Sequence, residues 1–275
     1  MVKAKNDRSM ARSDTNSRKT IGPSTSSFRI MREGSRSNHG HIARTLGMEI
    51  LSGKLKPSKT LPSEPELLAR FEVSRTVLRE VTKTLAAKGL VVAKTRVGTT
   101  VLPSEHWNFF DKDVLSWRLD LGYDATLRDD IAEMRLAFEP KAAALAAKCR
   151  TREQLAELRK WIGRMRQPGH SRQSYAEADL GFHLAVGTAS GNVLMRGVSA
   201  VIETALVASF RLNSPVDEPD VMIDSVASHE AIVDAIEARD AKKAAAAMEK
   251  VISMGVARIT AGQKSRSKKS SRTKK

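Results

Sequence analysis

Two helix-start signals stand close together in residues 41–103, and they constrain the fold more than any other feature of the chain. The run Ser63-Glu64-Pro65-Glu66 places serine at a cap, glutamate three positions later to close a capping box, and proline in the first turn. Ser74 is a second cap signal, and the apolar spacing of the preceding helix ends at Phe71. These signals predict two helices joined by a short turn.

The segments on either side complete this unit. Ile42, Leu46 and Ile50 recur at four-residue spacing, which predicts an earlier helix. Beyond the third helix, residues 90–94 and 99–102 have the pattern of two short strands around a turn. Three helices followed by a β-hairpin, with a short turn between the second and third helices, predict a winged helix-turn-helix.

Positive charge is concentrated in this unit and at the two ends of the chain. The chain has 47 Lys+Arg against 31 Asp+Glu and a net charge of +16, yet residues 104–263 hold 20 basic and 23 acidic residues. Residues 41–103 hold 11 basic and 5 acidic residues, and residues 264–275 hold 7 basic residues and no acidic one. Clustered lysine and arginine attract a polyanion, because contact with phosphates releases condensed counterions. We therefore expect double-stranded DNA as a partner.

Apolar and alanine positions recur at three- and four-residue spacing through the rest of the chain, which predicts an all-α bundle of six or seven helices. Pro140 predicts a kink or a restart in the first of these helices. The fold class is mostly α. The expected organisation is a disordered basic tail over residues 1–38, the winged helix-turn-helix over 39–103, a linker over 104–115, a helical effector-binding and dimerisation domain over 116–262, and a disordered basic tail over 263–275.

Several protein classes are excluded or disfavoured by composition. The single cysteine, Cys149, excludes an intramolecular disulfide and a cysteine-based zinc cage. No apolar run reaches the roughly 20 residues that a membrane helix needs, and the basic N-terminal segment lacks the apolar stretch of a secretory signal. We expect a cytoplasmic protein without membrane contact. The tails serve either solubility or non-specific attraction to DNA.

The helix that begins after Ser74 carries candidate base-reading residues. Arg75, Thr76 and Arg79 occupy its start and one face, while Val77 lies behind them. Arginine pairs bidentately with guanine, and threonine contacts a phosphate or a thymine methyl group. The alternative is a solvated basic face of an ordinary domain, which the surrounding winged pattern disfavours. The predicted DNA-binding residues are Ser63, Glu64, Ser74, Arg75, Thr76, Val77, Arg79, Lys94, Arg96, Gly98 and Thr99.

A longer series of residues in this unit matches a known pattern in order and spacing. The series is Gly53, Leu55, Pro57, Leu61, Pro62, Ser63, Glu64, Glu66, Leu67, Val73, Ser74, Arg75, Leu78, Arg79, Leu85, Gly89, Leu90, Val91, Gly98, Thr99 and Val101. It resembles the DNA-binding domain of GntR-family bacterial transcription regulators. The fatty-acid-responsive type in that family has a DNA-binding arginine after the glutamate, where this chain has Pro65, so the resemblance implies that this one contact is absent.

Asp179 and His183 are four residues apart, so a carboxylate and an imidazole project from one helix face. His229 can add a third ligand, and this donor set suits Zn, Ni or Mn. The alternative is a capped or salt-bridged pair. Arg135 is a candidate partner for an anionic ligand, because its planar guanidinium matches a carboxylate.

The helical part resembles the effector domain of the FadR subfamily, known as the FCD domain. Its landmarks are matched by Arg135-x3-Glu139, Asp179-x3-His183, Ser190-Gly191-Asn192 and Ser228-His229-Glu230. Metal-binding members have a further histidine where this chain has Val251, so the resemblance implies a site with at most three protein ligands and a metal affinity that is weaker or absent. Without a metal, these side chains are expected to bind hydroxyl or carboxylate groups of the effector directly. The expected effector-binding residues are Arg135, Asp179, His183, Asn192, Arg211 and His229.

Residues 106–117 resemble the junction in sugar-acid regulators, in particular the galactonate-responsive type. We therefore predict a homodimeric transcription regulator, a repressor in this interpretation, that binds a palindromic operator and is released by a small carboxylate effector such as a sugar acid. Two alternatives stay open. One is a metal-dependent enzyme that acts on a hydroxy acid, and the other is a protein that binds DNA without sequence preference.

Overall fold

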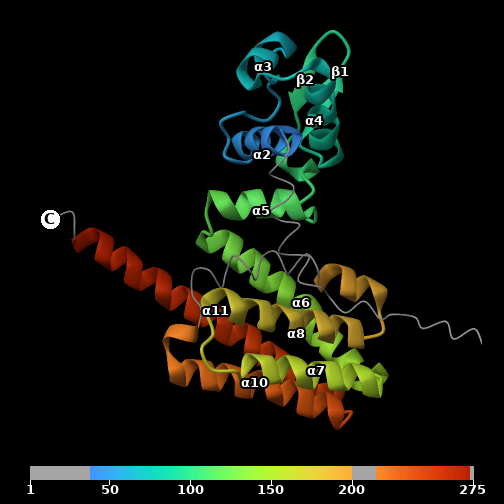
Figure 1. Ribbon diagram of the computed structural model, residues 1–275, viewed down its shortest axis with the longest axis vertical. Coiled ribbons are helices and arrows are strands. Elements are labelled where there is room, and N and C mark those ends of the chain that lie inside the picture. The colour runs from blue at the N-terminus through green and yellow to red at the C-terminus, as the bar shows by residue number, and fades with distance from the viewer. Residues whose placement is uncertain (1–37, 200–214, 273–275) are drawn as a thin grey trace, which may run out of the picture.

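The computed structural model describes residues 38–199 and 215–272, with side chains as far as residue 261. The described residues form an N-terminal unit of short helices and a hairpin, followed by a bundle of longer helices (Figure 1). The prediction of a mostly α fold with one small hairpin is confirmed. Residues 1–37 of the expected N-terminal tail and the effector candidate Arg211 lie outside the described residues.

The N-terminal unit is the predicted winged helix-turn-helix. Its elements in chain order are α2 (Asn38–Leu51), α3 (Glu64–Phe71), α4 (Arg75–Ala87), β1 (Val91–Lys94) and β2 (Gly98–Val101). Ser63 and Glu66 form the expected capping box, and the Ser74 hydroxyl accepts a hydrogen bond from the Val77 amide at 3.4 Å. The strands pair antiparallel, and their apolar residues share one core with α2 and α4.

The segment after the hairpin is more ordered than a linker. A short 3-10 turn, η1 (Ser104–His106), leads into the helix α5 (Lys112–Leu121). Val114 and Trp117 of α5 are buried in the core of the winged unit. The linker expected over residues 104–115 therefore ends inside a helix. Local sequence patterns do not show this, because Trp117 contacts residues that lie far away in the sequence.

The C-terminal unit is an all-α bundle with one large core. Its helices are α6 (Ala125–Cys149), α7 (Arg152–Met165), α8 (Arg172–Ala189), α10 (Pro219–Glu237) and α11 (Ala241–Arg272), with a 3-10 turn η2 (Pro215–Asp217) before α10. Alanine-rich faces of α6 pack against α8, α10 and α11 around Tyr175, Phe182 and Met248, all three fully buried. This close packing needs small side chains, which explains the many alanines in the sequence.

α6 runs through Pro140 without a restart, so of the two outcomes expected there only the kink stays a prediction. The C-terminal end differs from the expectation. The start of a disordered tail was expected at residue 263, whereas α11 continues to Arg272. Within residues 38–199 and 215–272, no helix has the length and apolar character needed to cross a membrane.

Candidate DNA interface and buried polar site

α4 presents a basic face to solvent. Arg75, Thr76 and Arg79 are exposed, whereas Val77 is half-buried and Leu78 is part of the core. The apolar side of α4 is therefore held by the domain, and the side with the two arginines is free to approach a duplex. This division follows from the helical spacing of the sequence.

A carboxylate at the start of α3 lies beside this face. The Arg75 side chain is 76% exposed, and its Nε lies 3.5 Å from Glu64 Oε1. Pro65, next in the chain, is exposed as well. A solvent-exposed pair at this distance contributes little to stability, so Arg75 can exchange it for a phosphate or a base at small cost.

The wing extends the exposed surface. Lys94, Arg96 and Gly98 are exposed at the end of the hairpin, and Thr99 is half-buried in β2. Arg96 has a φ of 61° and Gly98 a φ of 101°, values that form the tight turn between the strands. Val97, between them, is 58% exposed. The predicted wing residues therefore stand at one projecting tip.

Asp179, His183 and His229 are brought together in the interior of the bundle, the first two from α8 and the third from α10. One ligand atom from each lies within 4.8 Å of the others, and all three residues are buried. His229 Nε2 lies 3.0 Å from Asp179 Oδ1, and His183 Nε2 lies 3.7 Å from Asp179 Oδ2. The predicted three-residue cluster is therefore present as a spatial arrangement.

Neighbouring groups fix the orientation of both imidazoles. His229 Nδ1 lies 2.7 Å from the Ser225 carbonyl oxygen, and Tyr175 donates a hydrogen bond to the Ser225 hydroxyl at 2.9 Å. His183 Nδ1 lies 2.6 Å from Glu139 Oε2. Each Nδ1 atom therefore faces an oxygen that accepts a hydrogen bond, and each Nε2 atom faces Asp179.

This arrangement fits a bound cation. Four buried atoms of the cluster have no hydrogen-bond partner of good geometry among the described residues: Asp179 Oδ2, Nδ1 and Nε2 of His183, and His229 Nε2. Buried polar atoms without a partner are costly, and a proton or a metal ion between the imidazoles and the carboxylate would satisfy them. Imidazole and carboxylate ligands suit Zn, Ni or Mn. Val251, at the position of the further family histidine, is buried in the apolar core, and the residue set therefore offers three ligands.

Arg135 and Glu139, one turn apart on α6, form a buried ion pair beside this cluster. Arg135 Nε lies 2.5 Å from Glu139 Oε1, and Nη2 lies 3.3 Å from Oε2. Burial alone would raise the pKa of Glu139, but Arg135 and His183 outweigh it and hold this pKa far below its ordinary value. Burial opposes ionisation of Asp179 too, and His229 is the main group that lowers its pKa nevertheless. Both carboxylates are therefore ionised.

One more predicted residue and three unforeseen ones can now be placed. Asn192 is exposed, and its Oδ1 accepts hydrogen bonds from the amides of Leu194 and Met195, which is the role of a helix cap. The sequence reasoning assigned no role to Glu139, Ser225 or Tyr175. The four-residue spacing of Arg135 and Glu139 was a visible signal of their pairing, whereas nothing in the sequence marks the contact of Tyr175 with Ser225.

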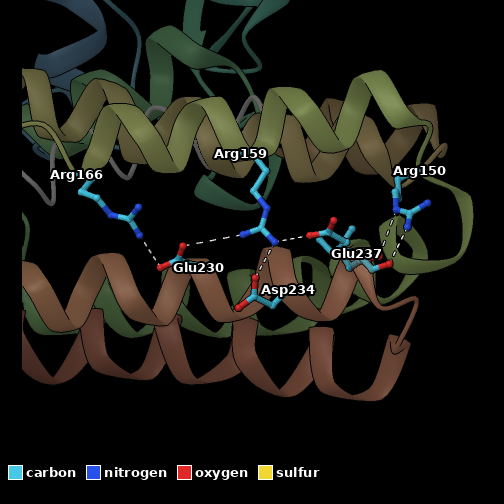
Figure 2. Close-up of polar contacts among 7 residues, drawn as sticks. Arg150, Arg159, Arg166, Glu230, Asp234 and Glu237 are labelled. Carbon is cyan, nitrogen blue, oxygen red and sulfur yellow. Dashed lines mark hydrogen bonds and ion pairs between the residues drawn. The ribbon is translucent and has the colours of Figure 1, made fainter.

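Ion pairs between α7 and α10 hold the helix that carries His229. Figure 2 shows Arg159 between Asp234 and Glu237, and Arg166 beside Glu230, the neighbour of His229. Arg159 Nη2 lies 2.7 Å from Asp234 Oδ1, and Arg166 Nη2 lies 2.6 Å from Glu230 Oε2. Exposed pairs are individually weak, but several along one helix fix its position against its neighbour.

Comparisons with known proteins agree with both units. Residues 38–101 match the model for bacterial regulatory proteins of the gntR family, and residues 130–254 match the FCD domain. The galactonate operon transcriptional repressor of Escherichia coli K12 is 34% identical over 218 residues, which cover 79% of this chain and 95% of that protein. YieP, an uncharacterized HTH-type transcriptional regulator of the same organism, is 34% identical over 71% of this chain and 84% of its own length.

A solved structure of Lar, which controls expression of the agr system in Listeria monocytogenes, has the same fold. Its TM-score is 0.57 at 17% identity, and the match covers 82% of this chain and 97% of that one. The matching families and the named relatives are transcription regulators, which decides against the enzyme alternative. The chain belongs to the gntR family of bacterial regulatory proteins and is a DNA-binding transcription regulator with an FCD domain.

Proposed function

We propose that the protein is a homodimeric repressor that acts in the cytoplasm, binds a palindromic operator through the exposed faces of α4 and the wing, and releases it when a small hydroxy-carboxylate binds in the bundle. The observation that carries the ligand assignment is the buried cluster of Asp179, His183 and His229, in which Asp179 Oδ2 and both Nε2 atoms have no hydrogen-bond partner in the described part of the chain. A buried cluster of this kind, far from the basic face of α4, is a sensor site separate from the DNA interface.

Asp179, His183 and His229 would hold a divalent ion with a coordination position left for a ligand oxygen. When bound, the ion supplies a Lewis-acid site that attracts the carboxylate and hydroxyl oxygens of an effector. Glu139 and the Ser225 carbonyl orient the two imidazoles for this task. Loss of the Glu139–His183 contact is therefore expected to weaken metal binding although all three metal ligands remain.

Arg135 is the proposed anchor for the effector carboxylate. Two of its three guanidinium nitrogens face Glu139, so an effector reaches it through Nη1 or displaces Glu139. Either event disturbs the contact between Glu139 and His183, since the same carboxylate serves both. The effector is a sugar acid in this proposal because the galactonate operon repressor is a similar protein, at 34% identity.

Release of DNA follows from the geometry of a two-fold dimer. Two recognition helices must match half-sites at a fixed separation, and a small change in their orientation removes several phosphate contacts at once. The effector must bind the released conformation more tightly than the DNA-bound one. A change near Arg135 and Glu139 on α6 can alter the orientation of the recognition helices, because α6 is connected through α5 to the winged unit.

A thermal-shift screen tests the ligand assignment. Aldonates and other hydroxy acids are added with Zn²⁺, with Mn²⁺ and with a chelator, and the melting temperature is recorded. We expect a rise with at least one aldonate that the chelator reduces and that the variant Asp179→Asn abolishes. A rise with an acyl thioester alone would contradict the sugar-acid assignment.

The Arg135→Lys variant tests the anchor, because lysine keeps a positive charge beside Glu139 but lacks the planar fork. Operator binding without effector should be unchanged, and the aldonate concentration that releases half of the DNA should rise by at least about tenfold, as expected for loss of a bidentate pair. Unchanged release would place the anchor elsewhere.

Binding of DNA without sequence preference is the remaining alternative, and competition separates it from the proposal. A duplex selected from random sequence should outcompete unselected duplex by about 10³-fold or more at physiological salt. Equal competition by both duplexes would favour the alternative.

A further inference from the structure

The helix α5 is packed into the winged unit on one face. Val114 is fully buried and Trp117 is 6% exposed, both within the core that α2 and α4 share. The Trp117 ring lies so close to α2 that a Cβ added at Gly47 would come within 2.3 Å of it. Such a contact leaves no room for α5 to slide on α2.

Ion pairs fasten both ends of α5 to the same unit. Lys88, which follows the recognition helix α4, is 7% exposed, and its Nζ lies 2.7 Å from both Asp111 Oδ1 and Asp113 Oδ2. Near the other end of α5, Arg44 of α2 lies 2.9 Å from Asp120. Burial would lower the pKa of Lys88, but hydrogen bonds from its ammonium group to the two carboxylates outweigh this and raise it.

Contacts of α5 with the effector domain are fewer and form a cluster of their own. Leu115 and Leu119 pack with Ile131 of α6, and Tyr123 and Leu127 flank them. This cluster is separate from the cores of both larger units. α5 is therefore packed mainly against the winged unit and makes a smaller contact with the effector domain.

The connection between α5 and α6 has the properties of a joint. Gly122 is exposed, with φ 146° and ψ 138°, a conformation that side-chain-bearing residues rarely adopt. Arg118 bridges it by donating from Nη1 to the Gly122 carbonyl at 2.9 Å and from Nη2 to Asp124 Oδ2 at 2.7 Å. Asp124 also caps α6, accepting from the Leu127 amide at 2.8 Å. One side chain thus ties the end of one helix to the start of the next.

We propose that α5 moves with the winged helix-turn-helix as one rigid body, and that the DNA-binding and effector units turn about the joint at Gly122, which Arg118 holds in the conformation seen here. Lys88 and Trp117 are positioning residues in this arrangement, because they fix α5 to the recognition helix and to α2. The packing and hydrogen bonds of α5 support the joint by themselves. The claim that an effector moves the joint depends on the proposed function.

The sensor site and the joint share α6. Ile131, in the small cluster under α5, lies one helical turn before Arg135, and Arg135 holds the Glu139 carboxylate that contacts His183. A shift of α6 that follows displacement of Glu139 therefore reaches the cluster directly, since a helix transmits displacement along its length as a stiff element.

Spin-label distances in the full-length protein test the joint without any ligand. Labels are placed in the winged unit by Lys56→Cys, on α5 by Lys112→Cys and on α6 at the native Cys149, each of which is exposed. Three two-label samples are made, with Cys149→Ser for the pair within the proposed rigid body, and labelled chains are diluted into unlabelled chains. Arg118→Ala is compared with Lys160→Ala, which breaks an exposed pair within α7 and serves as the charge-matched control.

Arg118→Ala should broaden both distances that end at Cys149 and leave the distance between residues 56 and 112 narrow, whereas Lys160→Ala should change none. A broadened distance between residues 56 and 112 would show that α5 is not part of the rigid body. No broadening in any pair would show that Arg118 does not hold the joint. Gly122→Ala, which is strained at this backbone conformation, should shift the same two distances and gives a second route if Arg118→Ala folds poorly.

Galactonate with Zn²⁺ then serves as a probe of the switch in the wild-type protein. The two distances that cross the joint should shift, and the distance within the rigid body should not. If Arg118→Ala broadens the distances but the probe shifts none of them, the joint stands and the effector assignment fails. A shift with the probe in the 56–112 pair would overturn the joint.

Discussion

Arg79 is exposed on α4 one turn after Arg75. If it reads a base, Arg79→Ala should weaken binding to a selected duplex by about 1–3 kcal/mol and relax preference at one position. Arg79→Lys separates the roles, because lysine keeps the charge but cannot make the bidentate contact with guanine. A base-reading role predicts that both variants lose specificity. Lys160→Ala is the control, and fluorescence anisotropy measures the affinities.

Glu49 is a nearly buried carboxylate that Arg70 grips with both Nη atoms, at 2.7 and 2.9 Å, while Lys54 lies 2.5 Å away. Hydrogen bonds from Arg70, helped by Lys54, lower its pKa from 4.5 to about 2. A lowered carboxyl pKa gives stability that is present above the unfolded-state pKa and is lost as the pH falls through the folded-state pKa. The affected window therefore runs from pH 4.5 down to about 2.

The variant Glu49→Gln tests this pair. It should lower the free energy of unfolding by about 1–2 kcal/mol at pH 7, the size expected for a hydrogen-bonded charge near the surface. It should also flatten the loss of stability below pH 4.5. Urea unfolding at a series of pH values measures both effects, and Glu133→Gln, at an exposed position on α6, is the control. An unaltered pH dependence would mean that the pair is already screened by solvent.

α2 and α5 pack closely where Gly47 faces the Trp117 ring, and a pair of glycine variants tests this packing. Gly47→Ala places a methyl group against the Trp117 ring and should destabilise the protein by about 1–3 kcal/mol through overpacking. Gly163 lies inside α7 with no atom within 4 Å of an added Cβ, so Gly163→Ala should be neutral or stabilise by up to about 1 kcal/mol. Equal effects of the two variants in thermal melts would contradict the packing argument.

The contact between Gly47 and Trp117 could not be predicted from the sequence, unlike the starts of the helices and the turn of the hairpin. The capping box at Ser63, the cap at Ser74 and the turn near Gly98 are local signals, and each was predicted because its partners lie a few residues away. Trp117 meets Gly47 only through the fold, so it was assigned to the effector domain, just beyond the expected linker. The pairing of Asp179 with His183 is visible as a spacing. His229 was proposed as a third ligand from its residue type, and its distance to Asp179 depends on how α10 packs.

Arg135 illustrates a different limit. Its residue type and neighbourhood predict an anion partner, and the sequence favoured an external carboxylate. In the structure the nearest carboxylate is internal, because four-residue spacing on α6 brings Glu139 to Arg135 and burial leaves no water to compete. A pattern of residues therefore identifies the chemistry of such a site more readily than the partner that satisfies it.

At the scale of the whole molecule, charge and recognition are carried by different segments. The exposed arginines of α4 occupy a defined place in the winged unit, whereas residues 264–275 hold seven further basic residues. Each phosphate that a protein neutralises adds about 0.9 to the slope of log affinity against log salt, whatever the base sequence. We therefore expect basic residues outside the winged unit, where they reach DNA, to raise affinity for every duplex equally.

A charge-neutral C-terminus tests this separation. Replacement of the seven Lys and Arg residues of 264–275 by Gln keeps the length of the chain. Affinity for unselected duplex should fall and its salt slope should become shallower by about 1 to 3, if a few of the seven contact phosphates. The preference for a selected duplex over unselected duplex should stay the same or rise, because α4 and the wing are unchanged. Salt titrations of both duplexes measure these quantities. Loss of the preference would mean that the C-terminal residues take part in specific recognition, and an unchanged slope would mean that they do not reach DNA.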